Sequence, residues 1–334
     1  MPVQSYVVTR PHPGSGVGSN LASLAGAVWC AQQLGRAVIV DWRGSAFLKD
    51  AALNYFTEFF DAPPAMQGVE VLYAPCPQLP EDPDRPDIEV MGVSRCREAI
   101  GRGSHTATHI VLRDYHGLDR LDPKGDQAAQ FWWMKRFYEG VPARAFIRDL
   151  VGRWADHHLA DAFIVGVNLS TGNGEFAKGE TYAGRVDLGI FADERAFLKR
   201  IEWARRAAVR GLPRHLRRRT KIFFATDSYA MHDLLQKVPG SVTRRTRFPP
   251  PGVGRVFCDY NEPGYTDRDA IVDAIADMLL LARCHALVRN GSVFNAYAQA
   301  VTAGFSGNVR HIESLYARYW MRAAANHLKR RLGR

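Results

Sequence analysis

The chain has 334 residues, of which 46% are hydrophobic and 23% are charged. This length exceeds the usual size of a single hydrophobic core and the composition is that of a globular protein, which excludes a disordered or fibrous chain and favours two domains. The sequence contains no run of about 18 apolar residues, and its N-terminus lacks the pattern of a signal peptide. We therefore expect a cytoplasmic protein without a transmembrane helix.

The spacing of cysteines and histidines predicts no metal site. The five cysteines lie far apart, and His12, His105, His109 and His116 have no partner at the spacing of metal ligands or of a catalytic triad. We expect reduced thiols, no metal and no cofactor apart from a bound substrate.

The formal net charge is +10, which favours an anionic partner such as a nucleotide, a nucleic acid or a lipid surface. The excess gathers in residues 199–221 and 329–334. The alternative is a solvated helix face, which is the commoner origin of a charge run. Aromatic residues are not interleaved with the basic ones between Arg205 and Lys221, so nucleic-acid binding is disfavoured.

The first half of the chain has the pattern of an α/β domain. An apolar run, a glycine-rich loop at 13–20, a helical pattern and a second apolar run form a βαβ unit, which requires a parallel sheet. We predict irregular surface with short extended pieces at 61–90, where proline and aspartate are frequent. The expected strands are 5–9, 37–40 and 108–112, and the expected helices are 21–34 and 147–160.

The glycine-rich loop does not match a nucleotide fingerprint. Gly14, Gly16 and Gly18 alternate instead of following G-x-G-x-x-G, and the Lys-Ser/Thr pair of a P-loop is missing. What remains is a helix N-terminus with available N–H groups, and Asn20 as a polar contact beside it.

An aromatic segment at 131–138 favours core packing, although sugars and lipids also stack on such side chains.

The second half repeats the strand–loop–helix order. We predict strands at 222–225 and 286–288 and helices at 193–210 and 269–282, after a strand that begins at Ile164. The repetition predicts two facing α/β domains, residues 1–155 and 156–310, followed by a basic amphipathic helix at 311–334. That final helix either lies on an anionic bilayer or packs back on the protein.

The strand that begins at Ile164 ends in a loop of small and polar residues, Asn168-Leu169-Ser170-Thr171-Gly172-Asn173-Gly174-Glu175. Glycines at a strand exit allow the backbone to approach a ligand. A plain surface turn is the alternative, since Asn and Gly are ordinary turn residues.

Several segments, in the same order, resemble the nodulation fucosyltransferase family of rhizobia. They are Gly16-Val17-Gly18-Ser19-Asn20-Leu21, Gln33-Leu34-Gly35-Arg36, Asp41-Trp42-Arg43-Gly44-Ser45, the 164–175 segment, Phe224-Ala225-Thr226-Asp227-Ser228 and Asp277-Met278-Leu279-Leu280-Leu281-Ala282-Arg283-Cys284. The resemblance covers residues 5 to 300. Each short motif is weakly specific, whereas the ordered set is fairly specific.

The resemblance implies a GT-B glycosyltransferase with two Rossmann-like domains. Such an enzyme transfers fucose from GDP-fucose to a glycan or a lipid-linked acceptor, with inversion and without a metal. The implied donor-binding residues are Asn168, Ser170, Gly172, Asn173, Gly174, Asp227, Ser228, Arg289 and Ser292. Gly16, Gly18, Asn20 and Arg43 are expected to reach the cleft from the first domain, which holds the acceptor.

One departure from the family lies in the central segment, where Asn168 and Ser170 replace a His and a phosphate-binding Arg. A neutral Ser cannot offset the charge of the departing diphosphate. Three alternatives remain. Another cation (Arg43, Arg113 or Arg289) takes the role of the Arg, the protein uses another donor, or it is a relative that binds a nucleotide or glycan without catalysis.

Inversion also requires a base near the acceptor hydroxyl. Glu175 is the acid closest in sequence to the glycine loop, and Asp41 and Asp114 end strands of the first domain. We take Glu175 as the candidate base, against the alternative of a solvated loop acid.

Overall fold

The computed structural model describes residues 5–11, 16–45, 48–73, 88–91, 93–102, 109–112, 127–169, 194–226, 229–245, 247, 266–289, 297–298 and 309–311. By its internal contacts the chain divides into two compact units. One comprises Met1–Leu150 and Val256–Ala276, and the other comprises Val151–Arg255 and Asp277–Arg334. The sequence analysis instead assigned residues 1–155 to a continuous first domain.

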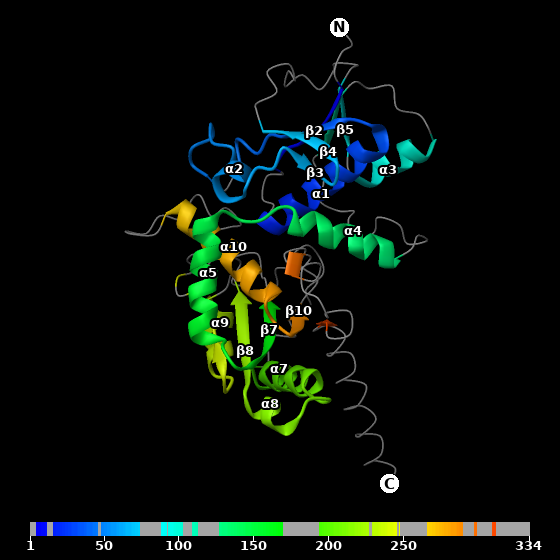
Figure 1. Cartoon of the computed structure of the whole chain (residues 1–334). Helices are drawn as coiled ribbons and strands as arrows, with labels where there is room; N and C mark the ends of the chain where they lie inside the picture. The colour runs from blue at the N-terminus through cyan, green and yellow to red at the C-terminus, as the bar shows by residue number, and fades with distance from the viewer. Residues whose placement is uncertain are drawn as a thin grey trace. The chain divides into compact units, whose positions relative to one another are not determined.

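The first unit is built on a six-stranded sheet in the order β3-β4-β2-β1-β6-β5 (Figure 1). All of its pairings are parallel except that of β3 with β4. The strands are β1 (Tyr6–Thr9), β2 (Ala37–Val40), β3 (Ala65–Met66), β4 (Val69–Leu72), β5 (Ile88–Met91) and β6 (His109–Leu112). The central strands β1 and β2 are almost wholly apolar because a parallel sheet is covered on both faces.

Helix α1 (Val17–Leu34) connects β1 to β2. It is rich in alanine and leucine, which are strong helix formers, and most of its side chains are buried. It ends at Gly35, whose φ of 62° is the left-handed conformation that glycine adopts without a steric penalty. The βαβ unit predicted at the start of the chain is confirmed.

The other helices among the described residues are α2 (Tyr55–Phe59), α3 (Val93–Arg102), α4 (Gln127–Glu139), α5 (Ala145–His158), α7 (Glu194–Ala208), α8 (Arg214–Arg218), α9 (Tyr229–Gln236) and α10 (Asp267–Ala282). Helix α4 contains the aromatic segment. Its Phe137 and Tyr138 are buried, whereas Trp132 is exposed.

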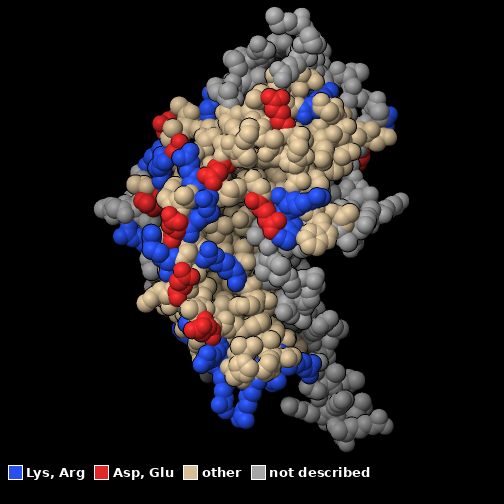
Figure 2. Space-filling view, in the orientation of Figure 1, with Lys and Arg blue, Asp and Glu red and all other residues tan. Residues whose placement is uncertain are grey.

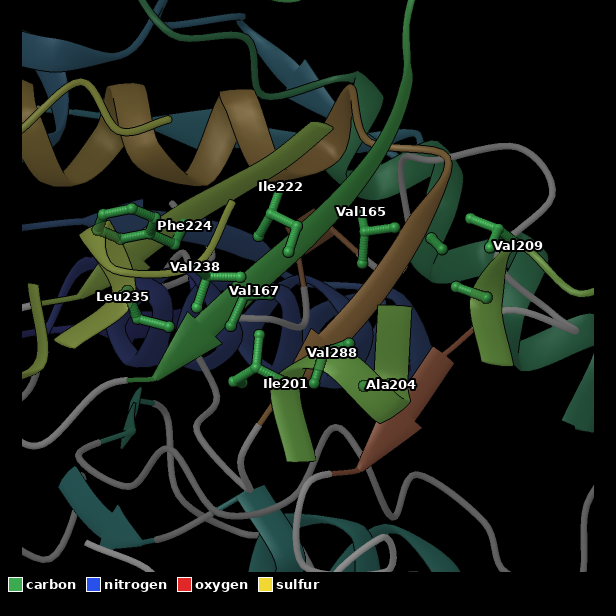
Figure 3. Packing of buried hydrophobic residues seen from close by; sticks show 12 residues of the cluster. Val165, Val167, Ile201, Ala204, Val209, Ile222, Phe224, Leu235, Val238 and Val288 are labelled. Carbon is green, nitrogen blue, oxygen red and sulfur yellow. The ribbon is translucent and has the colours of Figure 1, made fainter. Parts of the chain in front are cut away.

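The second unit is built on a five-stranded parallel sheet in the order β11-β10-β7-β8-β9. Its strands are β7 (Phe163–Leu169), β8 (Thr220–Thr226), β9 (Ser241–Val242), β10 (Ala286–Arg289) and β11 (Val309–His311). In Figure 3, Val165 and Val167 of β7 and Ile222 of β8 lie among Ile201 and Ala204 of α7, and all five are buried. This cluster fixes β7, the strand that leads into the predicted donor loop.

The α/β class and the two parallel sheets are as predicted. The segment 61–90, predicted as irregular surface with short extended pieces, contains the short strands β3 and β4 and the start of β5. These strands are short, and proline and aspartate obscure their pattern. Helices α2, α3, α4 and α8 were not predicted. The predicted basic helix at 311–334 lies, beyond His311, outside the described residues.

No helix in the described part of the chain is long and apolar enough to cross a membrane.

Candidate functional site

The strand ends of the second sheet bring the predicted donor-side segments together. Leu169 at the end of β7 pairs with Thr226 at the end of β8, and Asn168 pairs with Arg289 at the end of β10. The loops that begin at residues 170, 227 and 290 therefore leave adjacent strands at the same edge of the sheet. In open α/β folds this carboxyl edge is where ligands bind.

Asn168 lies at this edge and is buried, with 2% of its surface exposed. Its backbone sits between β8 and β10, where it is aligned with Ala225 on one side and with Arg289 on the other. A buried side-chain amide requires hydrogen-bond partners, so Asn168 belongs to the polar end of the strand rather than to the apolar core around Val167.

The other predicted donor-side residues lie outside the described residues, so their placement stays a prediction. They are Ser170, Gly172, Asn173, Gly174, Glu175, Asp227, Ser228 and Ser292. The alternative cation Arg113 and the alternative acid Asp114 also lie outside the described residues. Among the described residues, no group of three His, Cys, Asp or Glu side chains forms a metal cluster.

The carboxyl edge of the first sheet carries the predicted residues of the first unit. Thr9 of β1 pairs with Val40 of β2, and α1 begins directly after Gly16. Gly18 and Asn20 lie in the first turn of α1, and Asn20 is buried. No acidic residue occupies this turn. The positive end of the helix dipole therefore points to the carboxyl edge without a neutralising acid on its own first turn.

A charged cluster of Arg10, Asp41 and Arg43 occupies the same edge. Asp41 directly follows β2, and only 5% of its side chain is exposed. Arg43 donates to both carboxylate oxygens of Asp41, with Nε–Oδ1 at 2.7 Å and Nη2–Oδ2 at 3.1 Å. Arg10 approaches the same carboxylate at 3.6 Å. Two guanidinium groups around one carboxylate leave a net positive charge at the sheet edge.

The bidentate geometry stabilises the charged form of Arg43. The hydrogen bond from Arg43 to Asp41, helped by the attraction between their charges, raises the pKa of the Arg43 guanidinium. Arg43 therefore stays charged and is held in one orientation. Trp42, between the two residues, is fully buried and donates through Nε1 to Thr9 Oγ1 at 3.4 Å.

The sequence analysis selected Arg43 and named Asp41 as an acid, but it did not foresee that the two form an ion pair or that Arg10 joins them. The sequence did contain one indication of the pair, because Asp41 and Arg43 lie two residues apart directly after a strand. The analysis also missed a buried ion pair in the second unit, where Arg245 Nε lies 3.3 Å from Asp277 Oδ2 of α10. No sequence pattern connects these two residues, which are far apart along the chain.

Comparison with known proteins decides the family. The family model described as Nodulation protein Z (NodZ) matches residues 4–77 and 128–305, which is most of the chain and includes β1–β4 of the first sheet and β7–β10 of the second. The chain belongs to the NodZ family.

Two curated members show the extent of this match. Nodulation protein Z of Azorhizobium caulinodans is 27% identical over 294 residues, covering 82% of this chain and 82% of the relative. Nodulation protein Z of Bradyrhizobium diazoefficiens is 24% identical over 317 residues, covering 88% of this chain and 78% of the relative.

Solved structures support the same fold. The structure of NodZ α-1,6-fucosyltransferase soaked with GDP-fucose matches with a TM-score of 0.58 at 22% identity, covering 90% of this chain and 93% of that one. POFUT1 in complex with GDP-fucose matches with a TM-score of 0.53 at 10% identity, covering 93% of this chain and 98% of that one. The predicted GT-B class, with two Rossmann-like α/β units, is confirmed.

Proposed function

We propose that this protein is a fucosyltransferase that uses GDP-fucose and acts on a glycan or lipid-linked acceptor. The observation that carries the proposal is the NodZ family match, which spans the strands at whose carboxyl ends the donor-side segments begin. NodZ α-1,6-fucosyltransferase was solved after soaking with GDP-fucose.

The proposed reaction is a direct displacement with inversion, without a metal. The acceptor hydroxyl attacks the anomeric carbon of fucose from the face opposite to the diphosphate, and the bond to GDP breaks. A base takes the hydroxyl proton, a role we assign to Glu175, and GDP leaves with the bonding electrons. Donors at the sheet edge stabilise the negative charge that develops on the diphosphate.

We assign the donor to the second unit and the acceptor to the first. In the donor half, Gly172, Asn173 and Gly174 border the sugar, Asp227 and Ser228 contact the nucleotide, and Arg289 and Ser292 lie near the phosphates. Support comes from the register of β7, β8 and β10, whose carboxyl ends are adjacent. In the acceptor half, the support is the Arg10–Asp41–Arg43 cluster beside the start of α1.

The test is transfer of labelled fucose from GDP-fucose to an array of glycans, with product release followed as GDP. Labelled glycan together with GDP is the expected result. The binding-only alternative, which the family match disfavours, predicts that GDP-fucose binds without either product. Replacing Glu175 by Gln is expected to lower the rate by a factor on the order of 10²–10⁴, as removal of a general base does.

A second variant addresses Ser170. If the neutral side chain limits stabilisation of the diphosphate, then Ser170→Arg should raise the transfer rate, by a factor on the order of 10². A Ser170→Lys variant is the matched control, because it adds the charge without the bidentate geometry and should give a smaller increase. No increase with either variant would show that another cation already performs this role.

A further inference from the structure

Five exposed arginines gather on the second unit at the edge of the sheet opposite to the donor-side loops. They are Arg210, Arg214, Arg217, Arg218 and Arg219, and we call them the basic patch. Three of them lie on α8, a helix with no buried residue. Figure 2 shows basic side chains gathered at the end of the second unit where Figure 1 labels α8.

The basic patch differs from the arginines next to it in the sequence. Arg205 and Arg206 both pair with Glu202, at 2.7 and 2.8 Å. By contrast, no carboxylate of the described residues forms an ion pair with any arginine of the basic patch. Five charges on ten consecutive residues that form no ion pair within the described part of the chain repel one another, and a surface of this kind is stabilised by an anionic partner.

The local structure holds the patch in a fixed shape. Arg217 donates from Nε to the carbonyl of Leu212 at 2.6 Å, and Thr220 donates from Oγ1 to the carbonyl of Leu216 at 3.2 Å. Leu212 packs against the hydrophobic core of the second unit. The arginines are therefore presented on a short rigid connection rather than on a flexible tail.

Next to α8 the surface forms a groove of about 380 Å³. Its lining includes Arg218, Arg219 and Lys221 together with the acidic Asp161 of the turn at Ala160–Ala162. Guanidinium groups beside a groove suit the oxygens of a phosphate diester, to which arginine can donate two parallel hydrogen bonds.

The patch lies away from the proposed donor site. Strands β7 and β8 begin together at Phe163 and Thr220, beside the patch, and end together at Leu169 and Thr226. Seven residues of extended strand separate the two edges by about 20 Å. A partner bound to the basic patch would leave the donor-side loops accessible.

We propose that the basic patch is a docking surface for anionic membranes. Lipid phosphates form a continuous negative surface that matches a rigid group of arginines, and each basic residue near such a surface contributes about 1 kcal/mol. Nucleic acid fits less well, because residues 210–221 contain no Phe, Tyr or Trp on which a base stacks. This contact is independent of the one predicted for residues 311–334.

The test is flotation of the full-length protein with vesicles of phosphatidylcholine alone and of phosphatidylcholine mixed with phosphatidylglycerol. The protein should float only with the mixed vesicles, and added salt should release it because the attraction is electrostatic. Absence of flotation with the mixed vesicles, or equal flotation with both, would overturn the proposal.

The variant that removes the patch is Arg214→Gln/Arg218→Gln/Arg219→Gln, which spares Arg217 and its hydrogen bond to Leu212. Loss of three charges should lower the vesicle partition constant about a hundredfold. The matched control is Arg136→Gln/Arg144→Gln/Arg153→Gln, which removes three exposed charges outside the basic patch. Equal losses in both variants would show that only the overall charge matters and would contradict a specific surface.

Two further measurements test whether the basic patch, and not the C-terminal tail, contacts the membrane, and whether the patch binds nucleic acid instead. Deletion of residues 312–334 should leave flotation sensitive to the patch variant. If the deletion abolishes flotation and the patch variant does not, the contact belongs to the tail and the proposal is wrong. Binding of a labelled single-stranded oligonucleotide is measured in parallel. If the patch variant loses oligonucleotide binding but keeps vesicle binding, the patch binds nucleic acid and the proposal is wrong. Unchanged thermal unfolding of the patch variant, whose altered side chains are exposed, confirms that it is folded.

Discussion

Asp41 is the residue on which the polar edge of the first unit depends. Its carboxylate is buried and receives both Arg43 and Arg10. Replacement of Asp41 by Asn leaves two guanidinium groups without their counter-charge. We expect a loss of about 1–3 kcal/mol in the free energy of unfolding, because the carboxylate is buried and hydrogen-bonded while the two guanidinium groups are partly hydrated. Urea denaturation followed by circular dichroism measures it.

The matched control is Asp61→Asn in the same unit. Asp61 pairs with Arg148 at 2.7 Å, but both side chains are about half exposed, at 46% and 45%. Exposed pairs contribute about 0–1 kcal/mol, so this variant should unfold almost like the unmodified protein. A loss for Asp41→Asn that is no greater than the control would contradict the importance assigned to the buried cluster.

At the scale of elements, the packing of β7 on the segment that follows α10 depends on Gly166. A Cβ added at this position would lie 2.9 Å from Cys284 Sγ and 3.2 Å from Leu281 Cδ2. The first contact is too short and the second is tight, so the side chains of Cys284 and Leu281, or the strand itself, would have to shift. We expect Gly166→Ala to destabilise the protein by about 1–3 kcal/mol, which thermal or urea unfolding would measure.

Gly152 provides the opposite case within α5. A Cβ at Gly152 meets no atom within 4 Å, and alanine is favoured over glycine in a helix interior by about 1 kcal/mol. Gly152→Ala should therefore raise the unfolding midpoint. If Gly166→Ala also raises the midpoint, the close approach of Cys284 to β7 does not prevent a side chain larger than glycine at residue 166.

The start of β7 contains a contact that depends on pH. His285, which precedes β10, accepts a hydrogen bond at Nδ1 from the backbone N–H of Ile164, at 3.0 Å. Burial lowers the pKa of His285 below its ordinary value of 6.5. A protonated Nδ1 cannot accept this hydrogen bond. Because the folded pKa is depressed, this stabilisation is present above pH 6.5 and is lost as the pH falls toward the folded pKa.

We therefore expect the urea midpoint to decrease between pH 7 and pH 5.5, a window chosen around the ordinary histidine pKa of about 6.5. His285→Asn should reduce that decrease, because the Asn Oδ1 atom accepts the hydrogen bond without titrating. His158 and His232, whose pKa values are also lowered by burial, contribute to the pH dependence of both proteins. An identical decrease in the variant would show that the contact to Ile164 does not contribute.

At the scale of the whole molecule, the two parallel sheets were predictable because their central strands are continuous apolar runs followed by glycine or polar loops. Val7, Val38 and Val165 follow this pattern and all are buried. The edge strands β3 and β9 were not predictable, since each has only two residues and takes its conformation from its neighbour.

The candidate site was predictable only in part. Motif order identified the strand ends after Leu169 and Thr226, because the local sequence of a strand exit is visible in the chain. The ion pairs of Arg10 with Asp41 and of Arg245 with Asp277 were not predictable, because they join residues that only the folded sheet brings together. Long-range polar contacts of this kind leave no periodic signal.

The central claim is that this member of the NodZ family binds GDP-fucose as its donor. Thermal unfolding of the full chain with GDP, UDP and CMP, and with one sugar conjugate of each, tests it most directly. We predict that GDP and GDP-fucose raise the unfolding temperature at concentrations that give no change with the UDP and CMP ligands, because a ligand stabilises the state that binds it. Stabilisation by UDP or CMP in place of GDP, or by none of the nucleotides, would contradict the claim.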